Sequence, residues 1–277
     1  MAHYKEYLGL GVAGNFALHL EQAGESEDFK EVITDDPNGP KGMFPFYIPN
    51  RNDFLGTYPL SSDTIILPSE PCNVQIEPEV ALLCELTYDE AGHVTHIAPR
   101  FFGAYNDCSL RIEGALKISH KKNWGACSKG LSDTLIPIDD FTAGGVMDRY
   151  RIASFLRRDG MLMRYGEDVE LTGYSYFYDK LIGWMINQIN TQQNTGPLEP
   201  VSDYLKNAGF PKQAIISIGA TRYTTFGETN FLQEGDEIIV VVYDNNLYCM
   251  NPILMMANGN KLNVDGVSAL VQKVVRA

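Results

Sequence analysis

The 277-residue chain is 44% hydrophobic and 21% charged, which is the composition of an ordinary globular protein with a sizeable core. Its 35 acidic and 22 basic residues give a net charge of −13, which argues against a nucleic-acid partner, because such a partner requires a concentrated basic face. The chain has no apolar run near the ~18 residues of a membrane span, no secretory signal pattern and no CxxC pair among its five cysteines. We therefore expect a cytoplasmic protein without a disulfide framework or a structural zinc site.

The N-terminal third differs in pattern from the rest of the chain. Residues 15–23 could form a short helix, whereas residues 34–53 are crowded with Pro, Gly, Asn and Asp and predict an irregular segment. We therefore divide the chain into an N-terminal segment with a lid, residues 1–55, and a main domain, residues 56–277.

Strand patterns dominate from residue 64 onward. Residues 64–88 are expected to be mainly strand and to continue through an Asp-Glu-Ala-Gly turn into a strand at 93–98, which predicts a hairpin. One helix is expected over 176–190, because apolar residues recur there at helical spacing. Further strands are expected at 148–158, 214–219 and 236–249. The pattern predicts a strand-rich α+β fold with an irregular N-terminal cover.

Two carboxylates stand at the start of a continuously apolar strand. Residues two apart in a strand face the same side, so Glu77 and Glu79 present their side chains together. Pro78 between them cannot donate to a ladder, which favours an edge or a mouth of the sheet. Such a pair repels unless a proton or a cation lies between the carboxylates. The alternative interpretation is a pair of exposed glutamates.

Two later segments carry further polar side chains. Asp107 follows an aromatic run, and Arg111, four residues on, is placed to orient a carboxylate. Lys122 precedes an aromatic residue and a glycine-rich turn, and a lysine beside a hard cation would stabilise an enolate or oxyanion. The alternative is a solvated lysine.

Taken in order, these segments resemble the fumarylacetoacetate hydrolase superfamily. The resemblance covers roughly residues 49–240, and a motif near residue 15 extends it toward the N-terminus. The matching motifs are Glu77-Pro78-Glu79, NDCSLR (106–111), KNW (122–124), DGMLMRYGE (159–167), SIGATRYTTFG (217–227) and FLQEGDEIIVVV (231–242). The resemblance implies a mixed β-sheet roll with a few helices, a homodimer and a divalent-metal site.

The resemblance also assigns roles to individual residues. Glu77, Glu79 and Asp107 would bind Mg²⁺, or else Mn²⁺ or Ca²⁺, and carboxylate oxygens suit such hard cations. Lys122 would lie against the developing oxyanion. The substrate would be held by Arg111, Arg164 and Thr221, although Arg164 stands where many members have Gln.

The N-terminal motif matches the family and then departs from it. His19 falls where the family places the acid–base histidine of its lid, but Gln22 occupies the position of the glutamate three residues on. Glutamine orients a water molecule but cannot take its proton. His19 therefore acts alone, pairs with Glu21 or Glu25, or belongs to a site that has lost hydrolysis. The lid is expected to be mobile and to bring His19 within reach of the metal pocket.

These interpretations imply a metal-dependent hydrolase or lyase that cleaves a C–C bond in a small 2-oxo or 1,3-dicarbonyl carboxylic acid through a metal-stabilised enolate. One alternative is a non-catalytic protein of the same fold that binds a metal-chelating acid. The other is an NAD(P)-dependent oxidoreductase with GLGVAG (9–14) as its phosphate-binding loop, although the preceding segment is polar for a buried first strand. A glycine-rich lid hinge is the competing explanation for residues 9–14.

Overall fold

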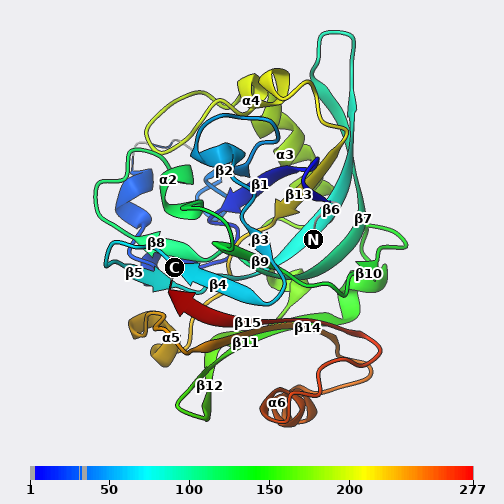
Figure 1. Cartoon of the computed structure of the whole chain (residues 1–277). Coiled ribbons are helices and arrows are strands. Elements are labelled where there is room, and N and C mark those ends of the chain that lie inside the picture. Colours follow the sequence, from blue (N-terminus) through cyan, green and yellow to red (C-terminus); the bar gives the residue numbers. More distant parts are fainter. Residues whose placement is uncertain (1–3, 31, 33–35, 277) are drawn as a thin grey trace.

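A computed structural model describes residues 4–30, 32 and 36–276, and its strands form three sheets (Figure 1). The eight-stranded sheet has the order β2 (Gly42–Tyr47), β1 (Leu8–Ala13), β13 (Gln213–Ser217), β6 (Pro78–Tyr88), β7 (Val94–Asn106), β9 (Lys129–Leu131) and β3 (Leu60–Ser61), with β10 (Ile136–Pro137) beside β7. The five-stranded sheet has the order β12 (Met161–Glu170), β11 (Tyr150–Arg158), β14 (Glu237–Asp244), β15 (Val267–Arg276) and β4 (Thr64–Leu67). Strand β5 (Asn73–Gln75) pairs with β8 (Ser109–Arg111).

Helices are few and mostly short. The α-helices are α1 (His19–Gln22), α2 (Ser119–Lys122), α3 (Tyr178–Thr191), α4 (Val201–Asn207), α5 (Thr225–Thr229) and α6 (Met250–Asn258). Short 3₁₀ turns occur at Ser26–Phe29, Phe54–Gly56, Val146–Arg149 and Leu171–Gly173. Parallel and antiparallel pairs occur in the same sheets, since β1 runs parallel to β13 while β6 runs antiparallel to both β13 and β7. The expected strand-rich α+β fold with a mixed sheet is confirmed.

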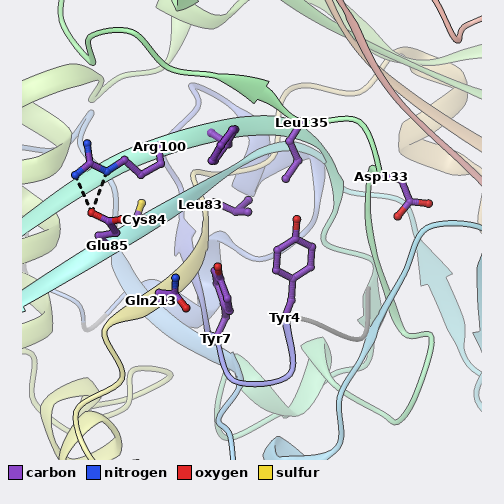
Figure 2. Close-up of a pocket in the computed structure, with 10 residues that line it drawn as sticks. Tyr4, Tyr7, Leu83, Cys84, Glu85, Arg100, Asp133, Leu135 and Gln213 are labelled. Atoms are coloured by element: carbon purple, nitrogen blue, oxygen red, sulfur yellow. Dashed lines mark hydrogen bonds and ion pairs between the residues drawn. The ribbon is translucent and has the colours of Figure 1, made fainter.

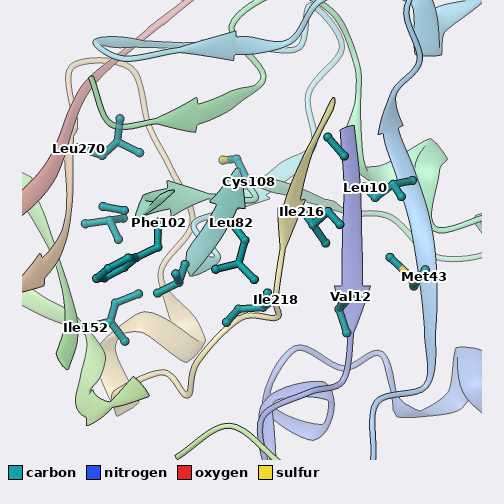
Figure 3. Packing of buried hydrophobic residues seen from close by; sticks show 14 of the residues in the cluster. Leu10, Val12, Met43, Leu82, Phe102, Cys108, Ile152, Ile216, Ile218 and Leu270 are labelled. Carbon is teal, nitrogen blue, oxygen red and sulfur yellow. The ribbon is translucent and has the colours of Figure 1, made fainter. Parts of the chain in front are cut away.

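The main core lies where the two large sheets face each other (Figure 3). Leu82 and Phe102 of the larger sheet and Ile152 and Leu270 of the smaller one are fully buried there. Burial of each such side chain stabilises the fold by about 1.5–3 kcal/mol. The other face of the smaller sheet is covered by α6, which buries Ile253. Among the described residues, no helix is long and apolar enough to span a membrane.

Several element boundaries agree with the sequence pattern, and others differ. The helix expected over 176–190 is α3, which buries Leu181, Met185 and Ile189 on one face. The strand expected at 93–98 continues to Asn106, because its second half pairs with β6 along the whole hairpin. The strand expected at 236–249 ends at Asp244, where a turn leads into α6.

Two expectations for the N-terminal third are wrong. Residues 42–47 were expected to be irregular but form β2, which tolerates Pro45 because β2 is an edge strand with a register shift there; residues 33–35 lie outside the described ranges. Residues 9–13 of the GLGVAG segment lie in β1 itself, so the segment is not a dinucleotide loop after a strand; Gly14 follows β1 with a φ of +72°, and a hinge there stays a prediction. Gly9 and Gly11 leave room for the rings of Phe46 and Phe44, with which any Cβ would collide. The domain boundary at residue 55 stays a prediction.

Candidate functional site

The β6–β7 hairpin brings three buried carboxylates together. Its register places Pro78 opposite Asn106, so that Glu77, just before β6, and Glu79, near its start, lie beside Asp107, which directly follows β7. The Asp107 amide donates to the Glu77 carbonyl at 2.9 Å, which closes this end of the hairpin. One ligand oxygen from each of the three carboxylates lies within 4.8 Å of the other two. The structure therefore gathers the residues to which the resemblance assigns a metal.

Cationic side chains surround the three carboxylates. Lys122 at the end of α2 places Nζ 2.5 Å from Glu77 Oε2 and 2.6 Å from Asp107 Oδ2. Lys129, at the start of β9, places Nζ 2.8 Å from Asp107 Oδ1. Arg111 places Nη2 2.9 Å from Glu77 Oε1. The cluster is therefore a network of alternating charges in a buried environment.

Lys129 is the cluster member that the sequence interpretation missed. Its side chain has no exposed surface and also donates to the carbonyl of Cys108 at 3.1 Å. The available signal was its position at the start of the short strand Lys-Gly-Leu, since a lysine in a buried strand needs an acidic partner. Tyr105 was also missed. It pairs with Glu79 across the hairpin, and burial together with the charges of Asp107 and Glu79 raises the pKa of its hydroxyl well above the usual range.

The two glutamates have opposite electrostatic environments. Burial opposes ionisation of Glu77, but Lys122 and Arg111 outweigh it and hold the pKa of Glu77 well below its usual range. Burial and repulsion from Asp107 and Glu77 raise the pKa of Glu79 well above its usual range. Glu79 accepts a hydrogen bond at 3.0 Å from the amide of Gly219, whose φ of +112° favours glycine. Glu79 is therefore the carboxylate that would gain most from an added cation.

His19 is a neutral base that shares a cavity with part of the cluster. Its Nδ1 is 3.0 Å from the carbonyl of Thr221, and because a carbonyl only accepts, Nδ1 carries the proton and Nε2 keeps its lone pair. Burial lowers the pKa of His19, against the opposing effect of Glu77, so the ring is uncharged near neutral pH. His19 lines a cavity of about 20 Å³ together with Glu77, Glu79 and Lys122. A cavity of that size has room for about one water molecule.

The lid, residues 14–25, is tied to the 218–223 turn by side-chain amides. Gln22 donates to the Tyr223 carbonyl at 3.2 Å and accepts from the Tyr223 amide at 2.9 Å, so both of its polar atoms are engaged. Asn15 donates to the carbonyls of Ile218 and Tyr176 and accepts from the Tyr176 amide. These contacts hold the lid against the body of the protein.

The two glutamates considered as partners of His19 lie in different places. Glu21 is exposed on α1. Glu25 lines the cavity, and its carboxylate lies 2.7 Å from Arg111 Nη1 and 3.2 Å from Lys121 Nζ. The negative charge of Glu25 acts to raise the pKa of His19, against the larger lowering effect of burial. The geometry therefore favours Glu25 as the partner of His19.

The three residues expected to hold a substrate lie at different distances from the cluster. Arg111 reaches the cluster, but it also donates to Gln75 at 2.6 Å and to the Tyr223 hydroxyl at 3.0 Å. The hydroxyl of Thr221 donates to the Pro78 carbonyl at 3.3 Å, so this residue positions His19 and the start of β6. Arg164 is exposed on β12, and the structure does not bring it to the cavity.

A larger cavity, of about 420 Å³, lies away from the carboxylate cluster (Figure 2). Tyr4, Tyr7 and Leu135 line it, and so does the ion pair of Arg100 with Glu85 at 2.7 Å. None of the residues lining it belongs to the cluster. The candidate site is therefore identified by its chemistry and not by its volume.

Comparison with known proteins supports the fold. The chain is similar to a yeast fumarylacetoacetate hydrolase family protein, with 14% identity and a TM-score of 0.56 over 99% of this chain and 95% of that one. It is also similar to a putative fumarylacetoacetate hydrolase family protein from Yersinia pestis, with 13% identity and a TM-score of 0.52 over 97% and 93% of the two chains. A 2-keto-3-deoxy-D-arabinonate dehydratase complexed with magnesium and 2,5-dioxopentanoate aligns with 15% identity and a TM-score of 0.54 over 98% and 73%.

These similarities show a fumarylacetoacetate hydrolase-like fold, as the sequence motifs indicated. No curated protein sequence matches the chain. One sequence family does match, over residues 25–274, a range that includes the carboxylate cluster and Glu25 but begins after His19. The chain therefore belongs to the family of unknown function designated DUF5718.

Proposed function

We propose that the chain is a divalent-metal-dependent enzyme that cleaves a C–C bond in a small 2-oxo or 1,3-dicarbonyl carboxylic acid. The observation that carries the proposal is the buried convergence of Glu77, Glu79 and Asp107 beside a cavity that the neutral His19 also lines, in a fold shared with a dehydratase complexed with magnesium and 2,5-dioxopentanoate. The base His19 and the cation Lys122 line the same cavity as Glu77 and Glu79. That arrangement suits proton transfer on a ligand held between them.

The residues present fit a hard divalent cation. Carboxylate oxygens no more than 4.8 Å apart can share an ion that binds oxygen ligands at about 2.0–2.6 Å. Both side-chain oxygens of Asp107 are buried, and the ammonium groups of Lys122 and Lys129 contact them at 2.6 Å and 2.8 Å. Glu77, Glu79 and Asp107 would hold the metal, which when bound would polarise a substrate carbonyl and stabilise an enolate.

The chain's own residues supply the remaining chemistry. Lys122 and Lys129 place positive charge beside the cluster, where it stabilises an oxyanion developing on the substrate. Arg111 orients Glu77, and the hydrogen bond to Thr221 fixes the tautomer of His19 so that Nε2 accepts a proton. The lid excludes bulk water while these groups act.

The contacts of Gln22 favour reactions that need no activated water. A hydrolase requires a group that orients and deprotonates a water molecule, but both polar atoms of Gln22 are engaged by Tyr223. Decarboxylation or another lyase reaction leaves the electron pair of the broken C–C bond in an enolate, which needs one proton. The cationic cluster can stabilise that enolate, and His19 Nε2 can take a proton from solvent and pass it to the enolate carbon. Within the proposed class we therefore favour a lyase. The same contacts of Gln22 also support a second candidate function, in which the protein binds a metal-chelating acid without turning it over.

Turnover assays with oxaloacetate and acetylpyruvate, in Mg²⁺ or Mn²⁺ and after chelation, test the proposal. We expect turnover that chelation removes and that Glu79→Gln abolishes. His19→Gln should lower it by about 10²–10⁴-fold, the usual contribution of a positioned acid–base group. His96→Gln, at an exposed position on β7, is the matched control and should retain activity. Saturable, metal-dependent binding without turnover would identify the binder, and the absence of any metal binding would refute both candidates.

A further inference from the structure

The ammonium group of Lys122 and a divalent cation would compete for the same carboxylate oxygens. Its Nζ lies within 2.6 Å of both Glu77 and Asp107, two of the three carboxylates that would hold the metal. The lysine side chain is 4% exposed, so the charge is fully committed to this pair. Asp107 Oδ1 faces Lys129 instead, at 2.8 Å. Lys122 is therefore the cation inside the ligand set, and Lys129 lies outside it.

Formal charge in the closed cluster is balanced when Glu79 is ionised, which is the form in which it would bind a metal. The three carboxylates face three cationic side chains, those of Lys122, Lys129 and Arg111. Around them, Glu25 is paired with Lys121 as well as with Arg111. A divalent cation bound alone, with Glu79 ionised, leaves two uncompensated positive charges in a buried site, which is costly in a medium of low polarity. A ligand with two negative charges that enters with the cation restores the balance.

We propose that Lys122 makes divalent-metal binding conditional on a dianionic ligand, because its ammonium group must leave Glu77 and Asp107 for the ion and then pairs with the ligand. This inference rests on the proposed metal-dependent function and narrows its substrate class to dianions such as a dicarboxylate with a 2-oxo group. The position of Lys122 at the end of the four-residue helix α2 suits this exchange. Its Nζ lies 5.4 Å from the centre of the Phe44 ring, and that aromatic face can hold the ammonium group as it moves.

The test is Mn²⁺ binding to the full chain, measured by calorimetry and by electron paramagnetic resonance, with and without oxalate as the dianionic probe. Acetate serves as the monoanionic control. Lys122→Met removes the ammonium group and keeps the length of the side chain, and Lys122→Gln keeps a donor without the charge. Lys121→Met is the matched control, because it removes the same charge from the adjacent residue, whose ammonium contacts Glu25. Thermal unfolding establishes that each variant is folded before binding is measured.

For the wild-type protein we expect oxalate, but not acetate, to raise Mn²⁺ affinity by about tenfold or more, within the ~5–150-fold range of coupled sites. Both Lys122 variants should bind Mn²⁺ alone about tenfold more tightly than the wild type and gain correspondingly less from oxalate. Lys121→Met should behave like the wild type.

Two results overturn the inference while leaving the proposed function intact. One is Mn²⁺ affinity without oxalate that is unchanged in both Lys122 variants, and the other is an equal gain in Lys121→Met, which would make the effect one of general charge. Failure of the proposed function has a different signature. In that case Mn²⁺ binds to neither the wild type nor any folded variant, with or without oxalate.

Discussion

The Gln22→Glu variant replaces one amide nitrogen of the lid with an oxygen and leaves the length of the side chain unchanged. In the wild type, Gln22 Nε2 donates to the Tyr223 carbonyl at 3.2 Å, and the Tyr223 amide donates back to Oε1 at 2.9 Å. Glutamate keeps the second hydrogen bond and loses the first. Its second oxygen then faces a carbonyl oxygen, which repels it.

The size of the effect follows from these contacts. Loss of one hydrogen bond costs about 0.5–1.5 kcal/mol net, and the carbonyl left without its donor adds to that loss. Gln22 is half-buried, so water can reach the Tyr223 carbonyl in part and limits the addition. We expect the closed lid to be destabilised by about 1–2 kcal/mol, which raises the population of the open lid about 5–30-fold.

Hydrogen exchange measured by mass spectrometry on the peptide covering residues 16–24 reports this opening directly. Exchange should accelerate there in Gln22→Glu, while the peptide covering α3 should be unaffected. Glu21→Gln is the matched control, because it makes the reverse chemical change at an exposed neighbouring position of α1. It should leave exchange of the lid unchanged.

One combination of results would refute the reasoning. If hydrogen exchange of the lid in Gln22→Glu equals that of the wild type and hydrolytic turnover rises, the hydrogen bonds of Gln22 do not hold the lid closed. The position would then be one from which an acid activates water, as in the family motif that the sequence resembles.

Three further predictions concern the groups around the cavity. Because burial lowers the pKa of His19 below 6.5, the stability from its neutral ring is fully present above pH 6.5 and is lost as the pH falls toward the folded-state pKa; an NMR titration of the imidazole giving a value above 6.5 would contradict this. Lys129→Met should lower the free energy of unfolding in urea by about 3–5 kcal/mol, because it leaves the charge of Asp107 buried with one partner fewer. Arg111→Lys should lower it by about 1–3 kcal/mol, since an ammonium group cannot hold both glutamates and the Tyr223 hydroxyl at once, and an unchanged unfolding midpoint would exclude that role.

The features that follow from local periodicity could be predicted from the sequence. Glu77 and Glu79 face the same side because strand geometry alternates, and α3 follows from apolar residues at helical spacing. Asp107 was associated with them through motif order, and the hairpin register supplies the physical reason, since it sets Asn106 opposite Pro78. Local backbone geometry constrains each of these patterns, so the residues concerned carry the information themselves.

Only the tertiary structure decided the partners of the remaining residues. Lys129 reaches Asp107 because β9 pairs with the end of β7, and Gln22 meets Tyr223 although 201 positions separate them in the sequence. Residues 42–47 become a strand because β1 offers them an open edge, although they lie within a stretch rich in Pro, Gly, Asn and Asp. Such contacts depend on which surfaces bury the most apolar area when the whole chain packs, and no local pattern encodes that sum.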